Sequence, residues 1–324
     1  MSSIVAIGSV AYDSVKTPFG EVEEVLGGSA TYFSVSASFF TQVDLVACVG
    51  RDFRQQDVEL LESRNVDLEG LEYMDGETFR WKGEYGHDLN EAKTLDTQLN
   101  VLSDFRPTLP KSYQDSSYVF LGNIDPSLQR QVLSQVKAPQ LVACDTMNYW
   151  IEGHFEALLE TLKSVDILLV NDAEARQLAQ ESNLVRGARK ILDWGPKILV
   201  IKRGEYGVLM FYRGSEGTPS HNELPTGEGL TVFGAPAYPL EDVFDPTGAG
   251  DSFAGGFVGY LAGVNRRDVQ AVRQAIIFGS VMASYCVEKF SLDRFRELTY
   301  PEVTRRYQEF RDMTHFEDIK QDSD

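Results

Sequence analysis

The residues best suited to chemistry lie in one short run, Asp245-Pro-Thr-Gly-Ala-Gly-Asp-Ser-Phe. Its small residues favour a turn, and the apolar stretch that follows, 252–263, predicts a helix. The first turn of a helix leaves backbone N–H groups without intrahelical partners, and the helix dipole adds a positive potential. This run therefore predicts an anion site suited to a phosphate group.

Asp251 stands where a bound phosphate would lie. A carboxylate beside an anion is unfavourable unless it has a role, such as taking a proton from an attacking hydroxyl group. The alternative is an ordinary helix start, with Asp251 as a capping residue among flexible glycines. The residues alone leave both interpretations open.

Short apolar runs alternate with amphipathic stretches along most of the chain. The pattern predicts strands near 45–50, 118–123, 140–145, 166–171 and 197–204, and helices near 54–64, 126–136, 152–163, 172–180 and 183–194. This alternation is typical of a doubly wound α/β fold, with a mainly parallel sheet covered by helices on both faces. Ligands collect beyond the carboxyl ends of such strands. Polar residues at these ends are Asp13, Asn123, Asp145, Asn171 and Lys202.

Residues 14–26 and 76–100 interrupt this rhythm, because they are polar and β-leaning and lack a helix pattern. They predict either a small β lid near the ligand edge or plain surface hairpins. Within the second segment, Phe79 and Trp81 alternate with charged residues, which places both on one face of a strand. That face is expected to cover the substrate, or the lid of a second copy in a homodimer.

We expect one domain over residues 1–312 and a frayed, acidic tail over 313–324. The chain has 324 residues and a formal charge of -19, which disfavours binding to nucleic acid or to an anionic membrane. Its three cysteines lie far apart in apolar runs, which favours reduced, buried thiols. No signal peptide or membrane-spanning run is recognised, so a cytoplasmic location is expected.

The run DPTGAGDSFAGGF (245–257) resembles the C-terminal motif of the ribokinase-like, or PfkB, carbohydrate kinase family. Four other features are similar to that family in order and spacing: Asp13 after the first strand, the di-glycine Gly27-Gly28, the NxxE of Asn171 to Glu174, and the turn Lys202 to Gly207. Together they cover roughly residues 4 to 290. The family fold is a doubly wound α/β domain with a β lid, in agreement with the pattern above.

The resemblance implies a role for each part of the motif. Asp251 would deprotonate the acceptor hydroxyl, while the amides of Gly248, Ala249 and Gly250 would form the anion hole for the transferring phosphoryl group. Asp245 and Thr247 match positions that bind potassium in relatives.

On the substrate side, the resemblance implies that Asp13 holds acceptor hydroxyls and that Gly27 and Gly28 let the backbone approach the acceptor. On the nucleotide side, ATP would meet one set of residues: Asn171, Glu174, Lys202, Gly204 and Gly207. Glu174 would organise Mg²⁺ through water. Taken alone, Asn171 to Glu174 is also an ordinary capped helix start.

Two departures from the family pattern concern the acceptor. Tyr32 stands where the family usually has an Asn that contacts sugar hydroxyls. Residues 145–150, DTMNYW, match the DxNxRxxxW stretch of some relatives only in part: Asn148 stays a substrate-binding candidate, but the Arg is absent. An aromatic wall at Tyr32 favours a ring-shaped polyol or a nucleoside, with a simple hexose or pentose as the alternative.

The sequence therefore predicts an ATP- and Mg²⁺-dependent kinase acting on a hydroxyl of a small sugar, cyclic polyol or nucleoside. One alternative is a GDS-type esterase, with Ser252 as nucleophile and His315 as its base. Another is a sugar or nucleotide sensor without catalysis on the same fold. Dinucleotide and P-loop binding are excluded, since GSVAYD has one glycine and no GK[ST] occurs.

Overall fold

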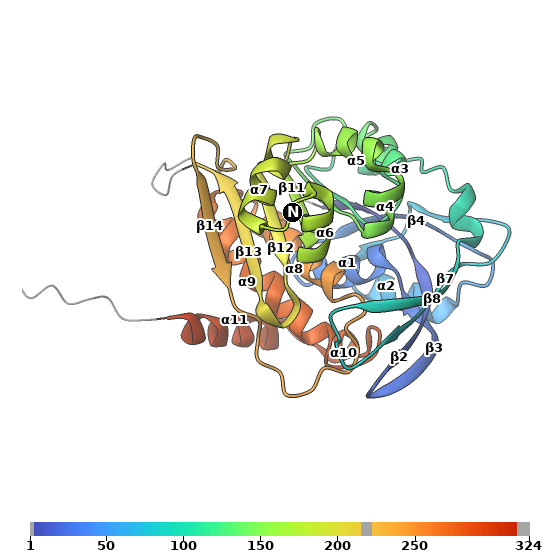
Figure 1. Cartoon of the computed structure of the whole chain (residues 1–324). Coiled ribbons are helices and arrows are strands. Elements are labelled where there is room, and N and C mark those ends of the chain that lie inside the picture. The colour runs from blue at the N-terminus through green and yellow to red at the C-terminus, as the bar shows by residue number, and fades with distance from the viewer. Residues whose placement is uncertain (1–2, 215–221, 316–324) are drawn as a thin grey trace, which may run out of the picture.

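A mainly parallel sheet runs through the computed structural model, which describes residues 3–214 and 222–315 (Figure 1). Its strand order is β14-β13-β12-β11-β10-β9-β1-β4-β5, and β6 also pairs with β4. Neighbouring strands from β12 to β5 are parallel, whereas β13 and β14 are antiparallel. The bounds are β1 Ile4–Ile7, β4 Val43–Val49, β5 Val66–Asp67, β6 Leu71–Tyr73, β9 Tyr118–Leu121, β10 Leu141–Asp145, β11 Ile167–Asn171, β12 Ile198–Lys202, β13 Val208–Arg213 and β14 Leu230–Ala235.

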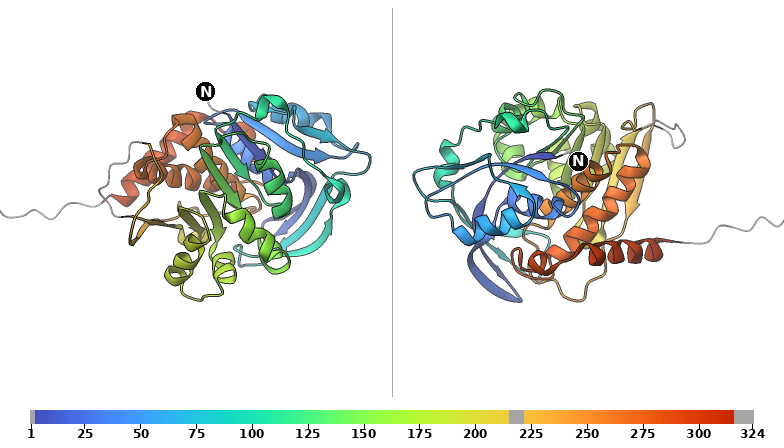
Figure 2. Two further views of the ribbon diagram at one scale, coloured as in Figure 1. Left: turned by 90° about the horizontal axis from the view of Figure 1, so that it is seen from above. Right: turned by 180° about the vertical axis from the view of Figure 1, so that it is seen from behind.

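Helices cover both faces of this sheet, because its strands present apolar side chains to either side (Figure 2). In β1, for example, Ile4 and Ala6 face one core while Val5 and Ile7 face the other. The first core packs against α1 Ser29–Ala37, α2 Gln55–Ser63, α8 Ala249–Val264, α9 Val269–Cys286, α10 Asp293–Glu297 and α11 Tyr300–Thr314. The second packs against α3 Pro126–Leu133, α4 Asn148–Gly153, α5 Phe155–Leu162, α6 Asp172–Ala179 and α7 Leu184–Asp193.

A second, four-stranded sheet projects from the main body as a lid (Figure 1). Its order is β3-β2-β7-β8, where the two central strands are parallel. The bounds are β2 Ala11–Thr17, β3 Gly20–Gly27, β7 Phe79–Tyr85 and β8 Ala92–Gln98. The two segments that interrupt the strand–helix rhythm therefore pair with each other, as the lid prediction requires.

The predicted strands and helices of the α/β body are confirmed, with small shifts at their ends. The antiparallel extension β13–β14 was not predicted. The expected boundary at residue 312 is wrong, because α11 continues to Thr314. The rest of the predicted tail, 316–324, lies outside the described residues.

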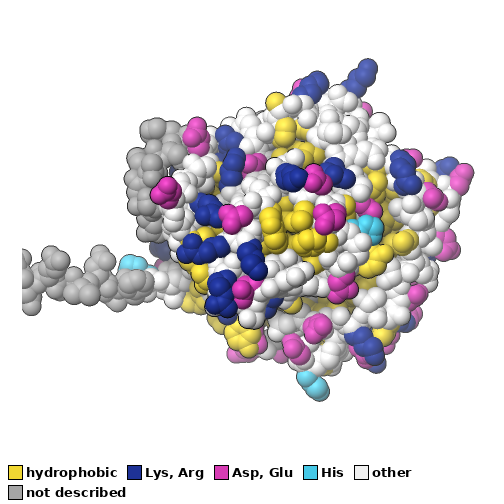
Figure 3. All heavy atoms as spheres, turned by 45° about the horizontal axis from the view of Figure 1, so that its top comes forward, with side chains coloured by type: hydrophobic (Ala, Val, Ile, Leu, Met, Phe, Trp, Pro, Cys, Tyr) yellow, Lys and Arg dark blue, Asp and Glu magenta, His cyan; other side chains and the backbone are white. Residues whose placement is uncertain are grey.

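Within the described residues, no helix is both long and apolar enough to cross a membrane. Cys48, Cys144 and Cys286 are buried free thiols, as predicted. On the face shown in Figure 3, basic and acidic side chains are interspersed, so the negative excess does not form one continuous acidic surface there.

Candidate active site

The turn into α8 has the backbone geometry expected of an anion site. Gly248 is the N-cap residue, with φ +74°, a left-handed conformation that favours glycine. The amide of Ser252 donates to its carbonyl at 2.8 Å, which starts the helix. The amide of Ala249 donates to Pro246 O at 3.2 Å. Of the three amides predicted for the anion hole, that of Ala249 is thus engaged within the turn.

A lysine from the main sheet reaches this turn. A Cβ added to Gly250 would lie 3.0 Å from Lys202 Nζ, so the ammonium group lies directly beside the glycine. Lys202 ends β12, and its ammonium donates to Asp145 Oδ2 at 2.9 Å from the end of β10. Asp145 is buried, and its other oxygen accepts from the Thr146 amide at 2.7 Å. A fixed positive charge therefore stands at the predicted anion hole.

Three carboxylates surround this ammonium group. Burial, then the charge of Asp145, raises the pKa of Asp251 above its usual range, and Lys202 opposes this shift. The same two causes raise the pKa of Glu174. Burial alone would lower the pKa of Lys202, but Asp145 and Glu174 outweigh it and raise that pKa. A carboxylate with a raised pKa beside an anion site is suited to accept a proton near neutral pH.

Asp13 lies on the lid side of the site, within β2. The Gly28 amide donates to its Oδ2 at 3.3 Å, and a Cβ on Gly27 would lie 1.9 Å from the same oxygen. Gly27 is thus required by the approach of this carboxylate, whereas Gly28, with φ +93°, lies against the Ser9 carbonyl. Burial, followed by the charges of Asp245 and Asp251, raises the pKa of Asp13 to about 7 despite the Gly28 hydrogen bond.

The inner face of the lid is aromatic. In the register of β2 with β7, Asp13 pairs with Trp81, so both side chains point to the same face. The Trp81 ring lies over Gly83, and further along β7 the Tyr85 hydroxyl contacts Thr247 Oγ1 at 3.4 Å. The lid therefore contacts the α8 turn through Tyr85 of β7.

Tyr32, predicted as an aromatic wall of the acceptor pocket, packs against the α8 turn. Its side chain is 1% exposed, and a Cβ on Gly248 would lie 2.3 Å from its ring. Burial and the nearby Asp245 and Asp13 carboxylates raise its pKa well above the usual value. The ring therefore supports the α8 turn from behind.

Asn171 and Glu174 form a capping box at the start of α6. The Asn171 amide donates to Glu174 Oε2 at 2.8 Å, and the Glu174 amide donates to Asn171 Oδ1 at 2.7 Å. The capping box uses Oε2 of Glu174, so the Oε1 atom can bind another group. The described residues contain no group of three or more His, Cys, Asp or Glu side chains that could hold a metal ion. A Mg²⁺ ion here would take most of its ligands from phosphates and water.

Two glycines of the predicted nucleotide side differ in their surroundings. Gly204 has φ +54°, and a Cβ there would meet Asn90 Oδ1, from the lid connection between β7 and β8, at 1.8 Å. Gly207, with φ +81°, is buried and would bring a Cβ to 2.2 Å from Ala235 O. The need for glycine at Gly207 is thus explained by packing against the end of β14.

Asp245 is 1% exposed and accepts two backbone hydrogen bonds, from the Thr247 amide at 2.9 Å and the Ser291 amide at 3.1 Å. It joins the loop before α8 to the loop after α9. Burial raises its pKa, although these hydrogen bonds act in the opposite direction. A buried carboxylate between two loops is a suitable ligand for a monovalent cation, alongside carbonyl oxygens.

The remaining candidates are Asn148 and the esterase pair of Ser252 and His315. Asn148 is exposed at the start of α4, where its Oδ1 accepts from the Tyr149 amide at 2.9 Å. Ser252 is 0% exposed, whereas His315 is exposed at the end of α11. A nucleophile must reach its substrate, so this geometry gives no support to the esterase alternative.

The model of the pfkB family of carbohydrate kinases matches residues 1–295. The chain belongs to this family. It is a phosphotransferase of the carbohydrate and nucleoside kinase type. It is 30% identical to a cytidine kinase of Thermococcus kodakarensis over 269 residues, 82% of this chain and 90% of that protein. It is 24% identical to an inositol 3-kinase of Arabidopsis thaliana, over 90% of this chain and 76% of that one.

The fold is likewise that of the ribokinase family. The structure of a nucleoside kinase from Methanocaldococcus jannaschii superposes with a TM-score of 0.72 at 19% identity, over 95% of this chain and 99% of that one. The mainly parallel sheet and its second, smaller sheet fit this likeness.

Sequence reasoning on this pfkB-family chain missed three contacts at the site. Asp145 was noted as a strand-end residue and as the start of the DTMNYW stretch, but not as the partner that holds Lys202. Tyr85 and Asn90, from the lid, contact the α8 turn and the Gly204 turn. The position of Asp145 at a strand end was a usable signal, whereas nothing in the local sequence marks the lid residues.

Proposed function

We propose that this chain transfers the γ-phosphoryl group of ATP, with Mg²⁺, to a hydroxyl group of a nucleoside or a cyclic polyol. The observation that carries the proposal is the Lys202 ammonium beside Gly250, next to Asp251 and opposite a lid that carries Asp13. A positive charge, a proton acceptor and a hydroxyl-binding carboxylate are the groups that phosphoryl transfer requires.

Each group has a distinct task in this proposal. Asp13 accepts hydrogen bonds from acceptor hydroxyls and orients the reacting one toward Asp251. Asp251 takes its proton as the new O–P bond forms and the bond to ADP breaks. The amides of Gly248 and Gly250, together with Lys202, balance charge on the transferring phosphoryl group. These residues catalyse by positioning and electrostatics, without a covalent intermediate.

Glu174 is the residue proposed to hold Mg²⁺ through water. Its carboxylate is a hard oxygen donor that lies within the electrostatic reach of Asp145 and Asp251, and its second oxygen is outside the capping box. The ion supplies charge neutralisation on the ATP phosphates. Asn171 and Gly204 are proposed to line the nucleotide side, and Asp245 with Thr247 a potassium site.

The acceptor class follows from the aromatic lid. The flat face of Trp81, on the same side of the lid as Asp13, suits a nucleobase or a cyclitol ring better than an open-chain sugar. The similarity to a cytidine kinase at 30% identity favours a nucleoside. A cyclitol is the second candidate, because an inositol 3-kinase is also similar.

The test is a phosphorylation screen read by ADP release, with ATP and Mg²⁺ against cytidine, inosine, myo-inositol, ribose and fructose. Turnover of a nucleoside, confirmed by ³¹P NMR of the product and abolished in Asp251→Asn, is the expected result. Binding of a nucleoside without turnover would instead identify the sensor alternative. Turnover of ribose or fructose alone would overturn the acceptor assignment.

A further inference from the structure

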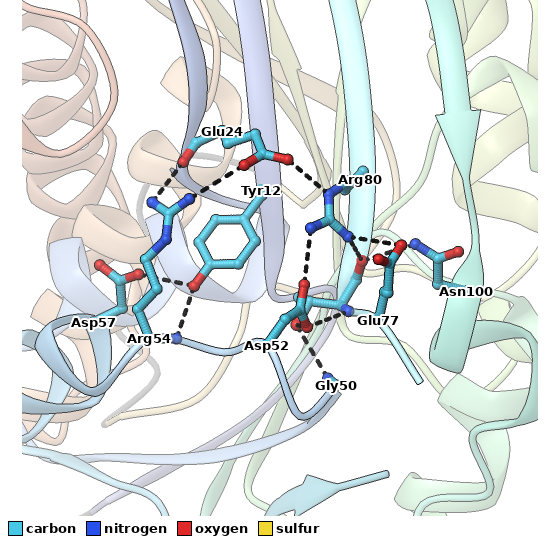
Figure 4. Close-up of polar contacts among 10 residues, drawn as sticks. Tyr12, Glu24, Gly50, Asp52, Arg54, Asp57, Glu77, Arg80 and Asn100 are labelled. Atoms are coloured by element: carbon cyan, nitrogen blue, oxygen red, sulfur yellow. Dashed lines mark hydrogen bonds and ion pairs between the residues drawn. The ribbon is translucent and has the colours of Figure 1, made fainter. Parts of the chain in front are cut away.

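Three side chains of the lid and three of the main body form a polar network at the base of the lid, which we call the lid clamp: Tyr12, Glu24 and Arg80 with Asp52, Arg54 and Asp57 (Figure 4). The clamp joins lid strands to Asp52 and Arg54, in the connection between β4 and α2, and to Asp57 in the first turn of α2. None of these side chains belongs to the proposed phosphoryl-transfer machinery.

Asp52 attaches strand β7 to the main body. Its Oδ1 accepts from the Thr78 amide and from the Thr78 hydroxyl, each at 2.8 Å, and its Oδ2 pairs with Arg80 Nη2 at 2.8 Å. Thr78 Oγ1 also accepts from the Gly50 amide at 3.0 Å. These hydrogen bonds, followed by the charge of Arg80, hold the pKa of Asp52 below its usual value although burial alone would raise it. The start of β7 is thus fixed by charge-assisted hydrogen bonds.

Tyr12 attaches strand β2 in the same way. Its buried hydroxyl donates to Asp57 Oδ2 at 3.0 Å and accepts from the Arg54 amide at 2.9 Å. The Arg54 guanidinium lies 4.3 Å from the centre of its ring. Asp57 and Arg54 stand at the start of α2, so β2 is anchored to this helix.

Glu24 connects the third strand, β3, to both arginines. Its Oε1 pairs with Arg80 Nε at 3.1 Å, its Oε2 with Arg54 Nη2 at 3.4 Å, and its carbonyl accepts from Arg54 Nη1 at 2.8 Å. Glu24 itself has φ +48°, an uncommon conformation for a residue with a side chain. The local backbone is therefore held in place by its partners.

The strand register links the clamp to the acceptor side of the lid. Tyr12 pairs with Arg80, and the next pair is Asp13 with Trp81. Because side chains alternate along a strand, Tyr12 and Arg80 point to the opposite face of the lid from Asp13 and Trp81. A shift of the clamp therefore moves the two acceptor-facing side chains directly.

We propose that the lid clamp sets the position of Asp13 and Trp81 over the acceptor, so that Asp52 and Glu24 are positioning residues for acceptor binding. This rests on the proposed function, in which Asp13 holds acceptor hydroxyls. The clamp itself makes no contact with the Lys202 side of the site among the described residues, so its loss is expected to affect the acceptor more than the nucleotide.

The test compares Asp52→Asn and Glu24→Gln with wild type. The amide introduced by Asp52→Asn would keep an acceptor oxygen for Thr78 but lose the charge that pairs with Arg80. The Asp52 and Glu24 side chains are 27% and 51% exposed, so both variants are expected to fold. Misplacement of substrate-orienting groups lowers rates steeply. In Asp52→Asn we expect kcat/KM for the acceptor to fall about tenfold or more, with the KM for ATP unchanged within about twofold.

Salt dependence separates a positioning role from general destabilisation. Partly exposed ion pairs weaken as salt screens them. The acceptor KM of wild type should rise with tetramethylammonium chloride at fixed potassium and magnesium, while that of Asp52→Asn should change little. The control is Asp75→Asn, which breaks a neighbouring, exposed pair with Arg51 and should behave like wild type. An unchanged acceptor KM in folded Asp52→Asn, or equal losses for acceptor and ATP, would overturn the proposal.

Hydrogen exchange tests the clamp without turnover. Amides of β2 and β7 should exchange faster in Asp52→Asn than in wild type, while those of β10 to β12 stay protected. If the amides of β2 and β7 exchange at the same rate in both proteins, the proposal that the clamp holds the lid is wrong. If wild type phosphorylates none of the acceptors, the proposed function fails, but this exchange comparison still decides whether the clamp holds the lid.

Discussion

Replacing Asp251 by Asn should abolish turnover while making the protein more stable above neutral pH. The amide has nearly the same shape but cannot accept the proton of the acceptor hydroxyl. Loss of a general base lowers the rate about 10²–10⁴-fold. At about 1.36 kcal/mol per decade, this raises the activation free energy by roughly 3–5 kcal/mol. The Lys202 ammonium keeps its partner Asp145 at 2.9 Å, so the anion site should survive.

The stability gain follows from the raised pKa of Asp251. Burial and the charge of Asp145 disfavour its ionised form in the folded state, whereas the unfolded chain ionises near the ordinary pKa of about 3.9. Wild type therefore loses stability as pH rises from about 4 toward neutrality, and the loss is complete above the folded-state pKa. Asp251→Asn has no such loss. One pKa unit corresponds to about 1.4 kcal/mol, so a gain of at least that order is expected at pH 8.

The assay combines turnover with unfolding. ADP release at pH 7.5 gives kcat, calorimetry with ADP checks nucleotide binding, and urea unfolding at pH 5, 6, 7 and 8 gives the stability difference. The control Asp115→Asn removes an exposed carboxylate paired with Lys137 and should change neither quantity. Turnover within about tenfold of wild type would refute the role of general base. A stability difference that is equal at pH 5 and pH 8 would refute the electrostatic reasoning.

Three further predictions concern the metal ions and the α8 turn. Glu174→Gln retains an acceptor for the capping box but loses the charge. The Mg²⁺ concentration for half-maximal rate should therefore rise about tenfold, while the KM for the acceptor stays constant. An unchanged Mg²⁺ titration would show that Glu174 is a capping residue only. Potassium should raise kcat through Asp245, and equal rates in sodium, potassium and tetramethylammonium would contradict this. Tyr32→Asn should lower both kcat and the free energy of unfolding, by about 3 kcal/mol for the latter, because the ring behind Gly248 is lost. Tyr32→Phe keeps that ring and should leave stability near wild type, and an equally large stability loss there would contradict the packing argument.

The sequence by itself determined the layered α/β architecture and the position of the lid. Strands such as β11 and helices such as α6 are predictable because hydrophobic periodicity and capping residues act within a few residues. The same holds for the turn into α8, where Gly248 adopts a positive φ that favours glycine. Asp251 was identifiable because its place at a helix start is a local property.

Only the tertiary structure decided which distant side chains meet at the site. Lys202 and Asp145 are 57 residues apart, and they meet because β12 and β10 flank β11 in the sheet, a distance that a long lysine side chain spans. Tyr32 looks like a pocket residue from its sequence position, yet the packing of α1 against α8 places its ring behind Gly248. Such contacts depend on strand order and helix packing, which periodicity does not encode.

The lid shows the same division between local pattern and long-range contact. Alternation along 79–85 predicted an apolar face that covers either the substrate or a second lid, but not the neighbours of each side chain. The parallel register of β2 with β7 puts Asp13 beside Trp81 and places Arg80 on the opposite face of the lid. Arg80 forms ion pairs with Glu24 and Asp52, which lie in segments far from it and from each other in the sequence. The sequence determines the chemical groups that each segment carries, whereas the fold determines which of these groups come into contact.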